Sequence, residues 1–117
     1  MLLFAFILLF SAASVFAAAP NWDVSGTWNL DFTFGSGHYL HTMTVTNFNL
    51  ITGAFSGTGV YNPDNSYTWT VTGTVDGSTV TFHILYTGTN AGYYVDTNGT
   101  INSTGILMSG TWSNPSQ

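Results

Sequence analysis

From residue 24 onward, apolar and polar side chains alternate along the chain, and no stretch repeats with the period of a helix. Between residues 67 and 75, for example, Tyr67, Trp69 and Val71 alternate with threonines. Because successive side chains of a β-strand point to opposite faces, this pattern predicts strands with one apolar and one polar face. We therefore expect an all-β fold of about seven strands, near residues 24–34, 39–48, 53–61, 67–75, 79–87, 92–101 and 105–112.

Short turns join these segments, and their lengths predict how neighbouring strands pair. The Asp76-Gly77 dipeptide is typical of a two-residue hairpin turn, and residues 35–38 and 102–105 suit four-residue turns. The expected pairs are Val75 with Ser78, Trp69 with Ile84, Phe34 with Tyr39, Phe32 with His41, Ile101 with Ile106, and Val95 with Trp112. Each pair joins residues of the same face, so the hairpins agree on a single antiparallel up-and-down meander.

Glycines indicate that this meander curls into a barrel. A tetrad with glycine second and threonine third begins at residues 25, 56, 72, 98 and 109. Each of these glycines falls on the apolar face, where glycine marks a bend or a close approach of two backbones. Gly59 is expected opposite Trp69, whose ring would cover the bare backbone. A β-sandwich also tolerates glycine-rich strands, but the short sequential hairpins favour a barrel.

We expect Trp28, Trp69, Val71, Phe82 and Ile84 to be deeply buried in this barrel, whereas Thr70 and Thr81 should be exposed.

An odd number of strands leaves the barrel with a closure problem. In a meander of seven strands, the first and the last run in the same direction and cannot pair antiparallel. Either the two strands pair in parallel, or a partner covers the gap, or the chain lacks a C-terminal strand. The two edges carry a single charge, Asp31, and charge is one protection of strand edges against association. Self-association through the strand edges is therefore one expected interaction.

The two ends of the chain lie outside the predicted barrel. Nine consecutive apolar residues at 2–10, followed by small residues, are typical of a secretory signal, and an uncleaved anchor is the alternative. We expect a signal peptide at residues 1–19, a linker at 20–23, the barrel at 24–113 and a tail at 114–117. The predicted protein is secreted, extracellular or periplasmic, and makes no membrane contact after signal cleavage.

Charge and composition exclude several classes of function. The chain has five acidic residues, no Lys or Arg and no Cys, and its formal net charge is −5. Nucleic acid is not an expected partner, because phosphate binding needs clustered cations. The lack of cysteine excludes disulfides, thiolate catalysis and cysteine-bound metals. We expect no cofactor.

Gly26-Thr27-Trp28 at the start of the first strand, followed by glycine-rich hairpins, resembles the calycin superfamily of lipocalins, fatty-acid-binding proteins and avidins. The segment after the signal also resembles a recurrent type of secreted prokaryotic protein, through residues 25–28, 39–44, 67–73 and 109–112. The resemblance implies a calycin-like barrel, complete or incomplete, in an extracellular setting. Lipocalins usually set an arginine against that tryptophan, and this chain has none, so no particular ligand is implied.

The candidate binding residues are aromatic residues of the inner face, together with one histidine. Inward aromatic side chains either fill a narrow barrel or line an apolar pocket at one of its ends. His41 shares this face, as a core histidine bonded to a neighbouring tyrosine or as a ligand contact. The predicted ligand-binding residues are His41, Tyr61, Tyr67, Trp69, Tyr86 and Tyr93.

Neither catalysis nor metal binding has a suitable set of residues. His38 and His41 point to opposite faces of a strand, and His83 faces outward on a distant strand. The carboxylates lie in turns, on outward positions or before the barrel, whereas glycoside hydrolysis needs two of them in one cleft. We expect no catalytic residues, no metal site and no enzyme activity.

Two functions remain open. The first, which we prefer, is a non-catalytic secreted barrel that binds a small apolar or aromatic molecule at its mouth. The second is a structural or adhesive module of the cell surface, which would act through its threonine-rich outer face or its exposed strand edges.

Overall fold

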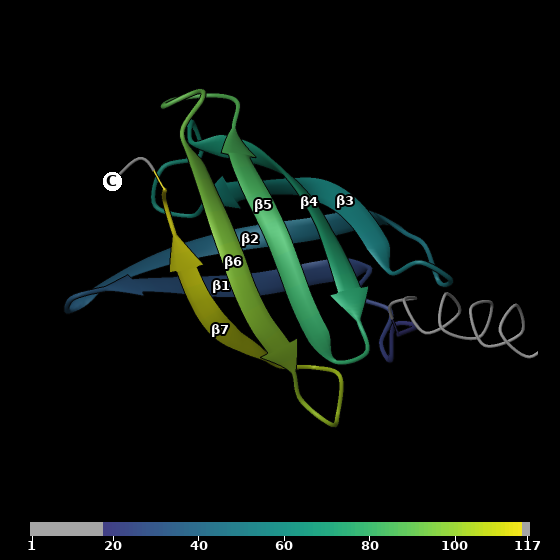
Figure 1. The fold of residues 1–117 in the computed structure, drawn as a ribbon. Helices are drawn as coiled ribbons and strands as arrows, with labels where there is room; N and C mark the ends of the chain where they lie inside the picture. The colour runs from purple at the N-terminus through teal and green to yellow at the C-terminus, as the bar shows by residue number, and fades with distance from the viewer. Residues whose placement is uncertain (1–17, 116–117) are drawn as a thin grey trace, which may run out of the picture.

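The computed structural model describes residues 18–115, which form seven β-strands (Figure 1). Most of the expected signal peptide lies outside the described residues. Each strand pairs antiparallel with the next one along the chain, which confirms the predicted all-β meander. The strands are β1 (Gly26–Phe34), β2 (Gly37–Phe48), β3 (Ala54–Tyr61), β4 (Thr68–Asp76), β5 (Thr79–Tyr86), β6 (Tyr94–Ile101) and β7 (Met108–Ser113).

The alternation of side chains decides which residues form the core. In β4, Trp69, Val71 and Val75 are buried, whereas the threonines between them are exposed. Ile84 is also buried and Thr81 is exposed, as expected. The buried core consists of Val24, Met43, Val45, Phe55, Trp69, Val71, Val75, Val80, Ile84, Val95 and Ile101.

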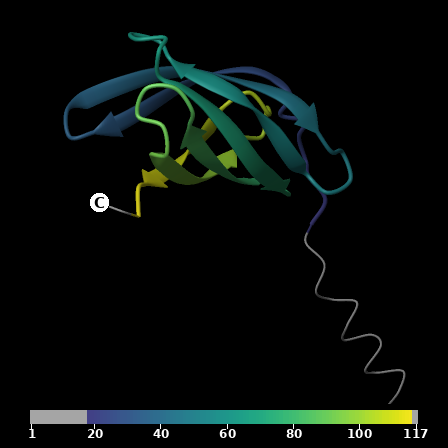
Figure 2. The same cartoon turned by 90° about the horizontal axis from the view of Figure 1, so that it is seen from above.

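The sheet curls into a nearly closed barrel whose open seam lies between β1 and β7 (Figures 1 and 2). Within residues 18–115 no backbone ladder joins these two strands, so the parallel pairing considered above is not formed. A groove of about 160 Å³ follows the seam and is bordered by Leu30, Phe82 and Met108. Trp28 and Phe82, expected to be deeply buried, are only half-buried, because β1 is an edge strand and Phe82 borders the groove.

One side chain bridges the seam. The indole Nε1–H of Trp112 on β7 donates a hydrogen bond of 3.0 Å to the main-chain carbonyl of Thr33 on β1. The Trp112 ring also contacts Phe32 edge-on, with 6.1 Å between the ring centroids, and Phe34 at 6.2 Å. The exposed backbone edge of β1 therefore gains a partner from a side chain of β7.

Three hairpins differ by two residues from the predicted register. Residues 35–36 and 77–78 form two-residue turns, in which Gly35 and Gly77 both have a φ of 59°, a conformation that suits glycine in such turns. The β6–β7 connection spans residues 102–107 and is longer than predicted. The observed pairs are Val75 with Val80, Trp69 with Tyr86, Phe34 with Gly37, Phe32 with Tyr39, Leu30 with His41, Ile101 with Met108, and Thr97 with Trp112. A shift of two residues keeps every side chain on its predicted face.

The segment before β1 closes one end of the barrel. The amide of Asn21 donates a hydrogen bond of 2.9 Å to the carbonyl of Gly77 in the β4–β5 turn. Trp22 packs against the core and covers Gly105, where an added Cβ would lie 2.5 Å from the indole ring. Asn21 and Trp22 of the expected linker therefore contact the barrel.

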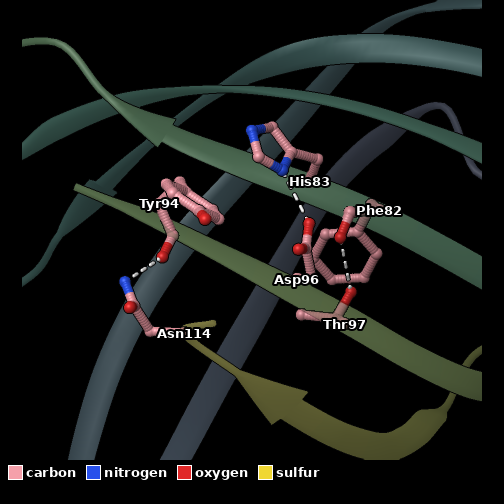
Figure 3. Close-up of polar contacts among 6 residues, drawn as sticks. All are labelled: Phe82, His83, Tyr94, Asp96, Thr97 and Asn114. Carbon is pink, nitrogen blue, oxygen red and sulfur yellow. Dashed lines mark hydrogen bonds and ion pairs between the residues drawn. The ribbon is translucent and has the colours of Figure 1, made fainter. Parts of the chain in front are cut away.

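The residue after β7 is also held in place. Asn114, expected to begin the tail, is buried, and its Nδ2 donates a hydrogen bond of 2.6 Å to the carbonyl of Tyr94 on β6 (Figure 3). Within residues 18–115, the structure contains no helix that is long and apolar enough to cross a membrane.

Candidate ligand-binding site

The end of the barrel opposite Trp22 contains a cavity of about 620 Å³. The cavity lies where β1, β3, β5 and β7 end and where β2, β4 and β6 begin. Its walls are mostly aromatic, because the alternation directs aromatic side chains inward at these strand ends. The lining residues are Phe32, Phe34, Tyr39, His41, Tyr61, Tyr67, Ile84, Tyr86, Asn90, Tyr93, Val95 and Trp112. The fold thus brings together five of the predicted site residues: His41, Tyr61, Tyr67, Tyr86 and Tyr93.

Trp69, the remaining predicted residue, does not line the cavity. Its side chain is 1% exposed, and its indole Nε1–H donates a hydrogen bond of 3.1 Å to Nδ1 of His41. Trp69 is therefore a positioning residue for His41 rather than part of the cavity wall.

Gly59 leaves the space that the Trp69 ring occupies. The two residues are paired across β3 and β4, as the sequence predicted, and a Cβ added at Gly59 would lie 2.2 Å from the indole ring. Real Cβ atoms do not approach other heavy atoms so closely, so only glycine permits this position of the ring. A backbone position on β3 thus determines, through Trp69, how His41 is held on β2.

His41 is neutral at neutral pH. Its side chain is buried, and desolvation lowers the pKa of His41 from 6.5 to about 4. Because Trp69 donates a hydrogen bond to Nδ1, the single proton of the neutral ring is on Nε2. The hydrogen-bond partner expected for a core histidine was a tyrosine, and the structure has the indole of Trp69 in its place.

The Nε2–H of His41 is available to a ligand. It makes no hydrogen bond with any described residue, because the one hydrogen bond of the ring is the one that Nδ1 accepts from Trp69. His41 lines the cavity, so this N–H group belongs to a residue of the cavity wall. The rings of Phe32 and Tyr61 flank the imidazole at centroid distances of 5.3 and 5.0 Å and fix its orientation.

Four tyrosines form the wall beyond His41. Ring centroids are 5.9 Å apart for Tyr61 and Tyr67, 6.4 Å for Tyr67 and Tyr86, and 5.4 Å for Tyr86 and Tyr93. None of these four hydroxyl groups makes a hydrogen bond with a described residue. Burial raises the pKa of Tyr86, and the neighbouring tyrosine hydroxyls raise it further. The cavity therefore combines apolar ring surface with several hydroxyl groups free to bond a ligand.

Seven of the lining residues were not among the predicted binding residues, and Tyr39 and Asn90 differ in how far the sequence could have identified them. Tyr39 has the same parity on β2 as His41, so the alternation alone could have identified it. Asn90 lies in the β5–β6 loop and has a positive φ of 66°. Its main-chain carbonyl accepts a hydrogen bond from the amide of Tyr93. No spacing rule predicts that such a loop residue reaches the cavity.

The other two histidines lie on the outer face, as predicted. His83 Nδ1 is 2.6 Å from Asp96 Oδ1 across β5 and β6 (Figure 3), and His38 Nδ1 is 2.9 Å from Asp31 Oδ2 across β1 and β2. Residues 18–115 contain no group of three or more acidic, histidine or cysteine side chains that could hold a metal ion. The polar chemistry of the cavity therefore comes from His41, Asn90 and the tyrosines.

The fold and the site together define a nearly closed β-barrel with an aromatic cavity at one end. No protein-family model, curated protein sequence or solved structure matches this chain. The resemblance to calycins stays a prediction that depends on the residues quoted for it.

Proposed function

We propose that this protein is a secreted, non-catalytic barrel that binds a small apolar or aromatic molecule in the cavity at its open end. The observation that carries the proposal is the fixed Nε2–H of neutral His41 in a wall of aromatic rings. Small-molecule sites are typically concave and mostly apolar, with a few polar groups that orient the ligand. The cavity volume of about 620 Å³ lies within the range of such sites, which is roughly 300–1,000 Å³.

The rings contribute affinity and His41 contributes orientation. Apolar surface buried on binding is worth about 25 cal/mol per Å², and aromatic walls also favour edge-to-face contacts with an aromatic ligand. A ligand with a carbonyl or ether oxygen can accept the hydrogen bond from His41. Left without such an acceptor, the N–H would lose its water on binding, which disfavours a purely hydrocarbon ligand.

A binding screen tests this proposal. We expect a fused-ring molecule with a carbonyl oxygen, such as coumarin, to raise the melting temperature of the protein, because a ligand of the native state stabilises it. The Tyr67→Ala variant should lose about tenfold in affinity for coumarin, since it removes one wall of the cavity. The matched control is Thr70→Ala on the outer face, which should bind as the unmodified protein does. Binding of equal strength to all three proteins would place the ligand elsewhere and overturn the proposal.

The open seam favours a second candidate function, that of a structural or adhesive module. The unpaired edges of β1 and β7 can accept a further strand, and the threonines of β4 present an uncharged polar face to solvent. Concentration-dependent assembly without any response to small aromatic molecules would favour this candidate over ligand binding.

A further inference from the structure

We propose that the ligand class of this cavity is an organic cation, a methylated ammonium group carried on an apolar body with a hydrogen-bond acceptor. This inference rests on the proposed function, because it names what the same cavity binds. It is carried by the arrangement of the tyrosine rings and by the charge of the chain.

The four tyrosine rings form a series of edge-to-face contacts in the cavity wall. The planes of Tyr61 and Tyr67 meet at 85°, those of Tyr67 and Tyr86 at 85°, and those of Tyr86 and Tyr93 at 75°. Neighbouring rings thus stand nearly perpendicular, so the edge of one ring lies against the face of the next and the four rings form one continuous aromatic wall. The face of an aromatic ring carries the negative part of its quadrupole, and a cation within about 6 Å of the centroid is attracted to it.

The polar atoms of the same wall also favour positive charge. The four tyrosine hydroxyl oxygens have no hydrogen-bond partner among the described residues, so their lone pairs are free to face a cation. The methyl groups of a quaternary ammonium need no hydrogen bonds, so such an ion can leave water for an aromatic wall more readily than a primary ammonium can.

The charge of the chain selects against anions. The whole sequence contains no Lys or Arg, and its formal net charge is −5. An anionic ligand would therefore lie in the cavity without a positive side chain as its partner, which is costly. A cation is instead attracted by the field of the whole protein, and this attraction weakens as salt is added.

His41 supplies the other half of the recognition. Its Nε2–H can donate to an oxygen of the ligand, while the ammonium group packs against the tyrosine rings. The expected ligand therefore carries both groups on one short apolar body.

A pair of probes that differ only in charge tests the inference. Acetylcholine has a trimethylammonium group and an ester carbonyl, and its neutral isostere has a carbon atom in place of the nitrogen. We expect titration calorimetry on the full chain to show acetylcholine bound at least about tenfold more tightly than the isostere, because only the cation gains from the ring faces. The preference should also decrease as salt is added.

Variants of Tyr86 separate the ring from its hydroxyl. Tyr86→Phe keeps the ring face and should retain most of the preference for the cation, whereas Tyr86→Leu removes the face and should reduce the preference about fivefold. The isostere should lose much less affinity in Tyr86→Leu, since leucine still offers apolar contact.

The outcomes distinguish this inference from the proposed function. If the isostere binds as tightly as acetylcholine, the cation preference is overturned while the cavity remains a binding site. If neither probe binds and coumarin does, the inference fails alone. If coumarin also fails to bind, the proposed function fails with it.

Discussion

At the scale of single residues, the site depends on a short series of contacts that begins outside the cavity. Gly59 leaves space for Trp69, and Trp69 holds His41 by a hydrogen bond of 3.1 Å. The hydrogen bond fixes the tautomer of His41 and so decides which ring nitrogen can donate to a ligand. The polar specificity of the cavity is therefore set by two residues that do not line it.

Substituting Gly59 tests this series of contacts. We expect Gly59→Ala to lower the free energy of unfolding by about 1–3 kcal/mol, because the added Cβ would lie 2.2 Å from the Trp69 ring and must displace it. Urea denaturation measures the loss. The neighbouring exposed residue offers a control, since Thr58→Ser should change stability by no more than about 0.5 kcal/mol. Equal effects of the two substitutions would contradict the close packing of Trp69 on Gly59.

Protonation of His41 should destabilise the fold in mild acid. Burial lowers the pKa of His41 from its ordinary value of 6.5 to about 4 in the folded protein, so between these pH values the unfolded chain binds the extra proton. Stability therefore falls as pH decreases from 6.5 toward 4, by at most about 3 kcal/mol. In His41→Gln, whose amide oxygen can still accept from Trp69, this part of the pH dependence should disappear. Parallel pH profiles of the two proteins, measured by urea denaturation, would rule out His41 as the source.

At the scale of elements, alternation predicted the faces of the strands but not their exact pairing. Trp69 lies opposite Tyr86 rather than Ile84, yet it keeps its predicted face because the register moved by two residues. Turn propensities could not separate Asp76-Gly77 from Gly77-Ser78, since both pairs suit a two-residue turn and both preserve the apolar face. Most of the cavity wall was predictable for the same reason, whereas Asn90 was not, because a loop has no period.

The seam also sets how much each inward residue of β5 contributes to stability. Ile84 is 2% exposed, and we expect Ile84→Ala to cost about 2–5 kcal/mol. Phe82 borders the groove along the seam and is half-buried, so Phe82→Ala should cost less than Ile84→Ala, although phenylalanine loses more atoms. Urea denaturation of both variants measures the two losses of stability. A larger loss in Phe82→Ala than in Ile84→Ala would indicate that the seam is covered in solution.

At the scale of the whole molecule, the two ends of the barrel differ in construction. Trp22 and the buried Val24 close one end with aromatic and aliphatic packing, whereas at the other end the aromatic residues line a cavity. The seam runs between the two ends of the barrel and leaves β1 and β7 as unpaired edges.

These edges should cause association at high concentration. We expect the mass measured by light scattering to rise with concentration, because unpaired strand edges readily accept another strand. Thr111→Lys places a charge on the edge strand β7 and should reduce this rise, whereas Thr70→Lys on the central strand β4 adds the same charge and should not. A constant monomeric mass, with amide exchange as slow on β1 and β7 as on β4, would show that the edges do not associate.

Trp112 belongs to both the cavity wall and the bridge across the seam. A ligand that packs on its indole therefore changes the free energy needed to separate β1 from β7. Thermodynamic linkage makes this coupling reciprocal: if occupancy of the cavity disfavours separation of the edges, then assembly through the separated edges weakens ligand affinity by the same factor. Ligand concentration would in that case regulate how many copies assemble.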